Sequence, residues 1–312
     1  MSTLRERLKF EIELSFPDFR KHDTLGPPGL SLSFHNKSCT EWHQEFVARI
    51  AGNLGTGQHL PVYRMSDGEY RFALRSSDVH PSSLESFARL LYLRARGLRG
   101  AHRSGSPEYG FETYSPDEVK VARETFLQAL KAHSREGIMA ISLHDTKLVR
   151  PYRAVMLDWY DTHDIRVDEN NHFHFYSVYV LLHGPDRQML YNNRRVLVVT
   201  SLTPEKKTGI ERGLLDAGAR SVRFLEISAG KALFDRLDLS GVEPPDLTLV
   251  GAGIGSVSVM RQLRPLGSVC IDCGFCLSTL ANPDLRFSRP YCVPDSEMDL
   301  ARVRFLPKGH SV

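Results

Sequence analysis

The fold class of this 312-residue chain is decided by the stretch Arg195-Val196-Leu197-Val198-Val199-Thr200. This short apolar run, rich in β-branched residues, predicts a buried strand. A helix is expected directly after it, over residues 205–216. Further strands are expected over residues 221–226, 247–250 and 268–272, with short helices over residues 231–237 and 256–263. Short strands that alternate with helices pair in parallel, so the sequence predicts an α/β fold with a doubly wound, mostly parallel, Rossmann-like sheet.

The first half of the chain continues this pattern. Strands are expected over residues 60–64 and 137–143, and helices over residues 40–50, 83–97, 115–134 and 155–160. The apolar segment 175–182 fits a helix or a strand, because its periodicity does not separate the two. No stretch rich in linker residues divides the chain. The sequence therefore predicts one α/β domain over residues 39–290, with an N-terminal extension (1–38) and a C-terminal tail (291–312).

The N-terminal extension is expected to be peripheral. Residues 4–14 are compatible with a short amphipathic helix. Pro17, the glycines and prolines of residues 26–29 and the serines after them argue against regular structure.

Composition excludes several classes of function. Lys and Arg number 40 against 37 Asp and Glu, a net charge of +3, which is too balanced to indicate nucleic-acid binding. No apolar run approaches the roughly 20 residues of a membrane helix. The first eight residues are charged and unlike a secretory signal, and five cysteines do not indicate a disulfide framework. We therefore expect a cytoplasmic protein without a transmembrane segment.

An Asp-Gly-Glu triplet follows the strand expected over residues 60–64. In a loop at the end of a strand, Asp67 and Glu69 can direct two carboxylates to one side, and Gly68 lets the backbone approach a ligand. Two neighbouring carboxylates suit a hard cation such as Mn²⁺ or Mg²⁺, which keeps positions for water and phosphate oxygens. The alternative is a solvated turn, since such triplets are common in loops.

Polar residues also follow the strand expected over residues 137–143. Asp145 is a candidate base or metal partner, and Lys147 and Arg150 are candidate phosphate ligands. In parallel sheets, ligands bind where the strands end. The alternative is that Asp145 or Thr146 caps the helix that follows.

A glycine-rich turn joins the strand at 247–250 to the next helix. Gly251, Gly253 and Gly255, followed by Ser256, expose backbone N–H groups that suit a phosphate. Asp272 ends the next strand, where a dinucleotide fold places its ribose-binding acid. The turn therefore fits a nucleotide-sugar site, and it also fits a Rossmann-type methyltransferase or oxidoreductase.

Two further groups of residues have a metal-binding interpretation. Cys270, Cys273 and Cys276 are spaced like ligands of zinc or an iron–sulfur cluster. Residues three apart on a strand point to opposite faces, however, so Cys270 and Cys273 are expected to diverge as buried thiols. His172 and His174 alternate as on a strand, and we expect partly buried histidines there rather than a metal site.

The stretch Arg64-Met65-Ser66-Asp67-Gly68-Glu69 resembles the Arg-Phe-Gly-Asp-Gly-Glu signature of bacterial glycosyltransferases with the GT-D fold. That family was formerly classed as a domain of unknown function. Residues 246–253 and 266–274 are similar to its C-terminal pattern, in which a strand, a turn and a helix precede a second strand ending in Asp-Ile-Gly-His. Residues 147–152 resemble a middle segment containing Arg-Pro-Tyr.

The resemblance implies transfer of a sugar from a nucleotide-diphosphate donor, most often a UDP-sugar, to a hydroxyl of a glycan, glycoprotein or small-molecule acceptor. It implies that Asp67 and Glu69 hold Mn²⁺ or Mg²⁺, that Arg64 assists them, and that the Gly251–Gly255 turn faces the nucleotide. Asp272 matches the family's aspartate.

The chain departs from the family after Asp272. The family's histidine is replaced by Phe275, and the acidic stretch that follows in the family is missing. Either the base comes from elsewhere, with Asp145 and Glu226 as candidates, or the acceptor chemistry differs. A nucleotide-binding protein of the same fold without transferase activity is the alternative.

Overall fold

The structure of the protein is a computed structural model that describes residues 2–14, 29–74, 79–97, 114–145, 149–184, 186–274 and 276–281. The predicted C-terminal tail, residues 291–312, lies outside these ranges. No helix in the described part of the chain combines the length and the apolar character of a membrane span.

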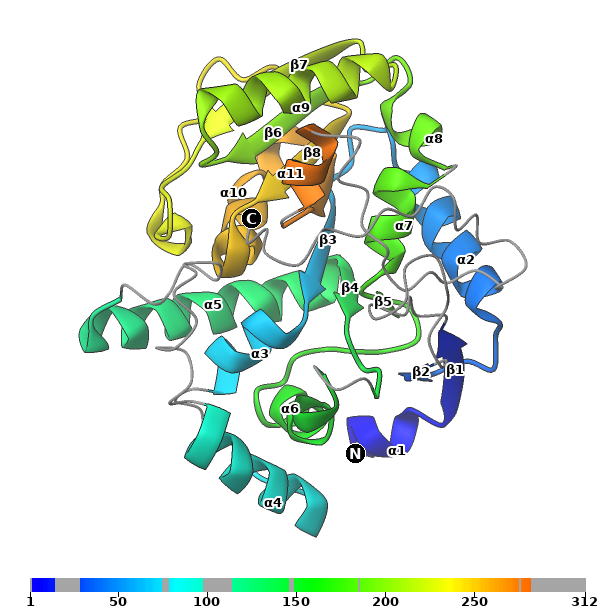
Figure 1. Cartoon of the computed structure of the whole chain (residues 1–312), viewed down its shortest axis with the longest axis vertical. Coiled ribbons are helices and arrows are strands. Elements are labelled where there is room, and N and C mark those ends of the chain that lie inside the picture. The colour runs from blue at the N-terminus through cyan, green and yellow to red at the C-terminus, as the bar shows by residue number, and fades with distance from the viewer. Residues whose placement is uncertain are drawn as a thin grey trace, which may run out of the picture.

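A parallel seven-stranded sheet runs through the described residues (Figure 1). Its order is β5-β4-β3-β9-β8-β6-β7, and every pairing in it is parallel. The strands are β3 (Leu60–Met65), β4 (Ile138–Ile141), β5 (His172–His174), β6 (Arg195–Thr200), β7 (Ser221–Glu226), β8 (Leu247–Gly251) and β9 (Val269–Asp272). The predicted α/β class and parallel sheet are confirmed.

Helices cover both faces of the sheet, and each face has its own apolar core. One face is covered by α3 (Asp67–Leu74), α5 (Pro116–Glu136), α6 (Arg150–Thr162), the 3₁₀ turn η3 (Ala232–Phe234) and α10 (Ser256–Gln262). The other is covered by α2 (Cys39–Ala51), α7 (Ser177–His183), α8 (Arg187–Tyr191), α9 (Pro204–Asp216) and α11 (Cys276–Ala281). The sheet is therefore doubly wound, as predicted.

Strand residues alternate between these two cores. In β3, Val62 packs into the core with α2, and its neighbour Tyr63 packs into the core with α5. In β9, Cys270 lies on the α5 side, while Ile271 lies on the α2 side. This alternation is the period-two geometry of a strand covered on both faces, and it explains why these strands read as continuous apolar runs.

The N-terminal extension differs from its prediction. The helix α1 spans only Leu4–Arg7, and β1 (Phe10–Leu14) pairs antiparallel with β2 (Gly29–Ser33). In β1 the buried residues are Ile12 and Leu14, so the segment follows a strand period that the prediction of a helix through residue 14 missed. The expected lack of regular structure in the serine-rich stretch is wrong for the same reason, since its pairing partner is distant in sequence.

The extension also contacts the main sheet. The Leu32 N–H donates to the Leu143 carbonyl at 3.2 Å, and the Asp145 N–H donates to the Leu30 carbonyl at 3.0 Å. β2 is thus bonded to the segment that leaves β4. Leu4 of α1 is fully buried in the same core as α6.

Three other predictions left the type of element open or made a helix too long. The segment 175–182, compatible with either period, contains the helix α7. The helix expected over residues 83–97 divides into α4 (Leu84–Tyr92) and the π-helical turn η1 (Leu93–Gly97). The helix expected over residues 231–237 is only the 3₁₀ turn η3.

We expect Gly213→Ala to destabilise the protein by about 1–3 kcal/mol, although alanine is the better helix former. A Cβ at Gly213 of α9 would lie 2.3 Å from the Leu280 carbonyl oxygen, so α9 and α11 would have to separate. Urea unfolding measures the change. Arg212→Ala, at the exposed neighbouring position, is the matched control. A more stable Gly213→Ala variant would contradict this packing.

Candidate functional site at the carboxyl edge of the sheet

Two neighbouring strands carry acidic residues at their carboxyl ends. β3 leads into α3, where Asp67 and Glu69 lie, and β9 ends at Asp272. From these adjacent strands the chain leaves to opposite faces of the sheet, since α3 packs in one core and α11 in the other. Open α/β sheets bind ligands outside the strand ends, at a point where the chain diverges in this way.

Asp67 and Glu69 lie in the first turn of α3 rather than in the loop that was predicted. The Ser66 N–H donates to Glu69 Oε2 at 3.0 Å, and the Tyr70 N–H donates to the Ser66 carbonyl at 2.8 Å. Residues two apart on a helix do not face each other. The Asp67 carboxylate accordingly lies 3.7 Å from Arg71 Nη2, while the Glu69 carboxylate turns back to Ser66.

The environment of Glu69 opposes its negative charge. Burial raises the pKa of this carboxyl to about 7, and the charges of Asp272 and Asp67 add to the increase. The bond from the Ser66 N–H acts in the opposite direction. A carboxyl with such a pKa exchanges a proton near neutrality, and a bound cation would favour its ionised form.

Asp272 is the best-connected acid of the site. Its Oδ2 accepts from the Arg64 backbone N–H at 3.3 Å, and its Oδ1 accepts from the Ser256 hydroxyl at 2.9 Å and the Gly274 N–H at 3.2 Å. Burial raises the pKa of Asp272, although these bonds and the Arg64 charge favour its ionised form. The carboxylate therefore joins β3, α10 and the turn after β9.

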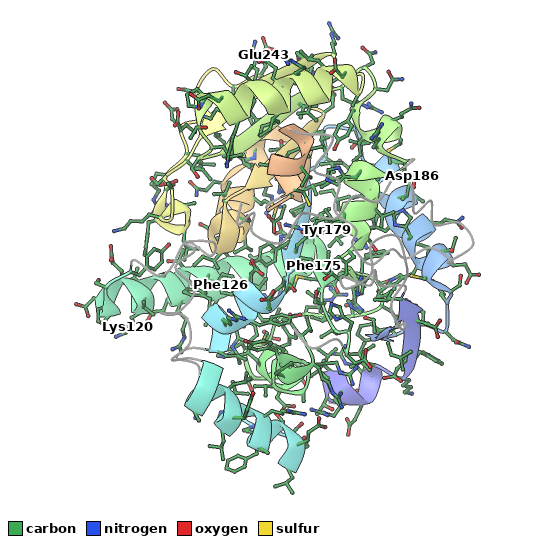
Figure 2. All side chains as sticks on the ribbon, viewed as in Figure 1. Lys120, Phe126, Phe175, Tyr179, Asp186 and Glu243 are labelled. Carbon is green, nitrogen blue, oxygen red and sulfur yellow. The ribbon has the colours of Figure 1, made fainter. Side chains whose placement is uncertain are left out.

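The Arg64 guanidinium lies beneath that turn. It packs over the rings of Phe175 and Tyr179, 4.9 and 5.0 Å from their centroids, and its Nη1 lies 3.9 Å from Cys276 Sγ. Figure 2 shows Phe175 and Tyr179 close together near the middle of the molecule, with 5.8 Å between their ring centroids. Aromatic faces stabilise a guanidinium, so the two rings hold the Arg64 side chain in place. Held there, the guanidinium packs against the turn at Gly274 from the inside of the molecule.

The glycine-rich turn has close neighbours on both sides. A Cβ at Gly251 would lie 2.5 Å from Leu277 Cδ1, and a Cβ at Gly255 would lie 2.7 Å from the Leu233 N. Gly253 has φ +54°, a backbone conformation that glycine adopts readily. Two of the three predicted cofactor-binding glycines thus allow close packing, and Ser256 bonds to Asp272.

The other predicted site residues that the structure describes, Asp145 and Glu226, do not lie beside Asp272. Asp145 follows β4, the other neighbour of β3, and its Oδ1 accepts from the Leu30 N–H at 2.9 Å. Glu226 ends β7 at the far edge of the sheet, where it pairs with Lys207. Lys147 lies outside the described residues. The structure therefore brings Arg64, Glu69, Ser256 and Asp272 together, with Asp145 one strand away.

No local sequence motif marks the aromatic residues around this site. Phe175 and Tyr179 lie four residues apart, a spacing that puts both on one side of a helical turn, but the helix itself was undecided. Tyr70, one residue after Glu69, donates through its hydroxyl to the Ser142 carbonyl at 2.6 Å. It thereby ties α3 to the segment that leaves β4.

The described residues contain no group of three or more His, Cys, Asp or Glu side chains arranged to hold a metal ion. The predicted divergence of the cysteines is confirmed, because Cys270 packs in one core and Cys273 and Cys276 pack in the other. His172 and His174 are buried, and burial lowers the pKa of His172 to about 3. A cation at the acidic edge would therefore have to draw ligands from its substrate or from water.

No protein-family model matches the chain, and no curated protein matches it either. Two solved structures are similar to it. One is the selenomethionine-substituted structure of domain of unknown function 1792, with a TM-score of 0.42 and 12% sequence identity. The other is of the same domain, described as having a distinct glycosyltransferase fold, with a TM-score of 0.39 and 13% identity. Each likeness covers 76% of this chain and 82% of the other.

Both structures are of a domain of unknown function, and the second is described as a glycosyltransferase fold. Both TM-scores lie below 0.5. We therefore infer the chemistry of the site from the residues of this chain.

We expect Glu69→Gln to stabilise the protein above pH 7 and to have little effect below pH 4.5. The folded-state pKa of about 7 lies above the ordinary 4.5, so the wild type loses stability as the pH rises through this window. Glutamine keeps the bond to Ser66 and removes the charge. The gain should be about 1–3 kcal/mol, measured by urea unfolding at both ends of the window.

The matched control for this experiment is Glu118→Gln. Glu118 likewise accepts from the N–H of the serine three residues before it, at the start of α5, but its bonds to Lys231 and Ser115 lower its pKa to about 2. Its replacement should reduce stability above pH 4.5. Equal responses of the two variants would contradict the assignment of the raised pKa to Glu69.

Proposed function

We propose that the protein is a metal-dependent glycosyltransferase that uses a nucleotide-diphosphate sugar, with UDP-sugar as the first candidate donor. The observation that carries this proposal is the pair of acidic strand ends, Asp67 with Glu69 after β3 and Asp272 at the end of β9, at a point where the chain diverges to opposite faces. A site at such a point suits a nucleotide, and its acids suit a cation that screens a diphosphate.

Asp67 and Glu69 would hold Mn²⁺ or Mg²⁺. These ions bind proteins through one or two carboxylates and complete their shell with water and substrate phosphates, which suits a site without a third protein ligand. Glu69 fits this arrangement, because burial raises the pKa of its carboxyl to about 7 and a cation would favour the ionised form. Asp67 lies 3.7 Å from Arg71 Nη2, so it would have to turn away from that arginine to reach the same ion. When bound, the metal would stabilise the charge that develops on the departing diphosphate.

Asp272, Ser256 and Arg64 would shape the donor side of the site. The Asp272 carboxylate fixes Ser256 at the start of α10, close to the partly buried Gly253 of the glycine turn. The Arg64 guanidinium lies on its aromatic rings below the turn, so we assign it a positioning role rather than contact with the phosphate.

Asp145 is our candidate for the base that accepts the proton of the acceptor hydroxyl. The segment from Cys273 to Ala281 contains no acidic residue, so the family's acidic stretch cannot supply one. Asp145 follows β4, next to β3, whereas three strands separate Glu226 from β3. One oxygen of Asp145 accepts from the Leu30 N–H, which holds the carboxylate in place.

A second candidate function rests on the unit formed by β8, the glycine turn, α10 and β9. An acid at the end of the second strand is the arrangement of dinucleotide-binding folds, which favours a methyltransferase or oxidoreductase. In this chain, however, Asp272 already accepts hydrogen bonds from Ser256, Gly274 and the Arg64 backbone. We therefore rank this function below sugar transfer.

We expect UDP to bind in the presence of Mn²⁺, and Asp67→Ala or Glu69→Gln to weaken that binding by about tenfold or more, because each removes one carboxylate from the ion. Calorimetric titration with and without the metal measures the effect. Asp117→Ala removes another acid from the first turn of a helix and is the matched control. Metal-independent binding, or no binding of any nucleoside diphosphate, would contradict the proposal and favour tests of S-adenosylmethionine and NAD.

We expect Asp145→Asn to reduce donor hydrolysis and transfer by about 10²–10⁴-fold while UDP binding stays unchanged, since it removes the base and not the donor site. Asparagine retains an oxygen for the Leu30 N–H, so the fold should be kept. Release of UDP from UDP-sugars measures turnover. An unchanged rate would assign the base to another residue, and binding without any turnover in the wild type would indicate a nucleotide-binding protein without transferase activity.

A further inference from the structure

The helix α4 has apolar residues on two opposite sides. Leu90, followed by Leu93 of η1, is buried in the core that includes α6. On the opposite side Leu84 is 84% exposed, and Phe87 and Leu91 are each 49% exposed. A helix needs only one apolar side to pack on its own domain, so the second side calls for another explanation.

The exposed side forms one continuous stripe. Leu84, Phe87 and Leu91 are spaced at i, i+3 and i+7, and Tyr92, 44% exposed, extends the stripe at its C-terminal end. Residues at this spacing lie on one side of a helix. We call these four residues the α4 stripe. Figure 1 shows α4 at the end of the molecule opposite α9, where it projects from the body.

Positive charge accompanies the stripe. From Leu84 to Gly97 the sequence contains three arginines, Arg89, Arg94 and Arg96, against one acid, Glu85, which lies in the first turn of α4. Arg94 is exposed, and Arg89 is partly exposed. A helix with leucine and phenylalanine on one side and arginine beside them is the pattern of helices that lie in the interface of an anionic bilayer.

We propose that the α4 stripe docks the protein on an anionic phospholipid surface. The apolar side chains would enter the boundary between head groups and acyl chains, and the arginines would contact the phosphates. The helix lies on the membrane and does not cross it, in keeping with its nine residues. This proposal is independent of the sugar-transfer function.

The charges favour a membrane over two other occupants of the stripe. A second copy of this chain would offer one acid, Glu85, against the three arginines, which leaves an excess of positive charge across the contact. The chain's own segment 282–312 contains five basic and four acidic residues, so it offers no excess of negative charge to these arginines. An anionic lipid surface provides both the apolar layer and the negative charge.

The test is sedimentation of the full chain with vesicles of phosphatidylcholine, with and without phosphatidylserine. The wild type should bind the anionic vesicles, and high salt should weaken the binding by screening its electrostatic part. The triple variant Leu84→Ser/Phe87→Ser/Leu91→Ser should lose binding by about tenfold or more, because it removes the inserted side chains. Arg89→Gln/Arg94→Gln should reduce the preference for phosphatidylserine.

Val121→Ser/Leu215→Ser removes exposed apolar side chains from α5 and α9 and is the matched control, which should bind like the wild type. If the triple variant fails to fold, two milder variants replace it: Leu84→Ser alone, at the most exposed position, and Arg89→Gln/Arg94→Gln. Each should still weaken binding to the anionic vesicles. Absence of wild-type binding, or binding unaffected by these changes, would overturn the proposal. A concentration-dependent dimer that the triple variant abolishes, seen by analytical ultracentrifugation, would assign the stripe to a second copy.

Discussion

The hydrogen bonds of the Asp272 carboxylate hold together the elements at the carboxyl edge of the sheet. It is buried at the end of β9, and its two oxygens accept from β3, from the start of α10 and from the turn that leads into α11. A buried carboxylate without such partners would be costly, and with them it fixes three elements at once. Asp272 thus connects elements on both faces of the sheet at the carboxyl edge. The same carboxylate is part of the structure of this edge and of the candidate site.

Most of the main sheet could be predicted from the sequence because its strands are covered on both faces. In the run 195–200, the four residues from Val196 to Val199 are apolar and buried, and a short run rich in β-branched residues favours a buried strand. The N-terminal extension could not be predicted in this way. The strand β1 is stabilised by β2, whose sequence of glycine, leucine and serine carries no strong local preference. Tertiary pairing decided its structure.

The candidate site was predictable in position but not in detail. The motif around Asp67 follows a strand, and the rule that ligands bind at strand ends located it correctly at the edge of the sheet. The prediction of a loop overlooked that Ser66 and Glu69 have the spacing of a helix start, because Gly68 between them also suits a turn. The aromatic rings under Arg64 come from a segment more than a hundred residues away, which local patterns do not reveal.

The packing of Arg64 against Gly274 limits how this chain can change. A Cβ at Gly274 would lie 2.1 Å from Arg64 Nη2, and Gly274 has φ +49°. No larger residue fits at position 274 while the arginine keeps its place, and shortening the arginine alone would leave the aromatic rings and the turn without their contact. The two positions therefore behave as one unit in sequence space. A change at either residue therefore requires a matching change at the other.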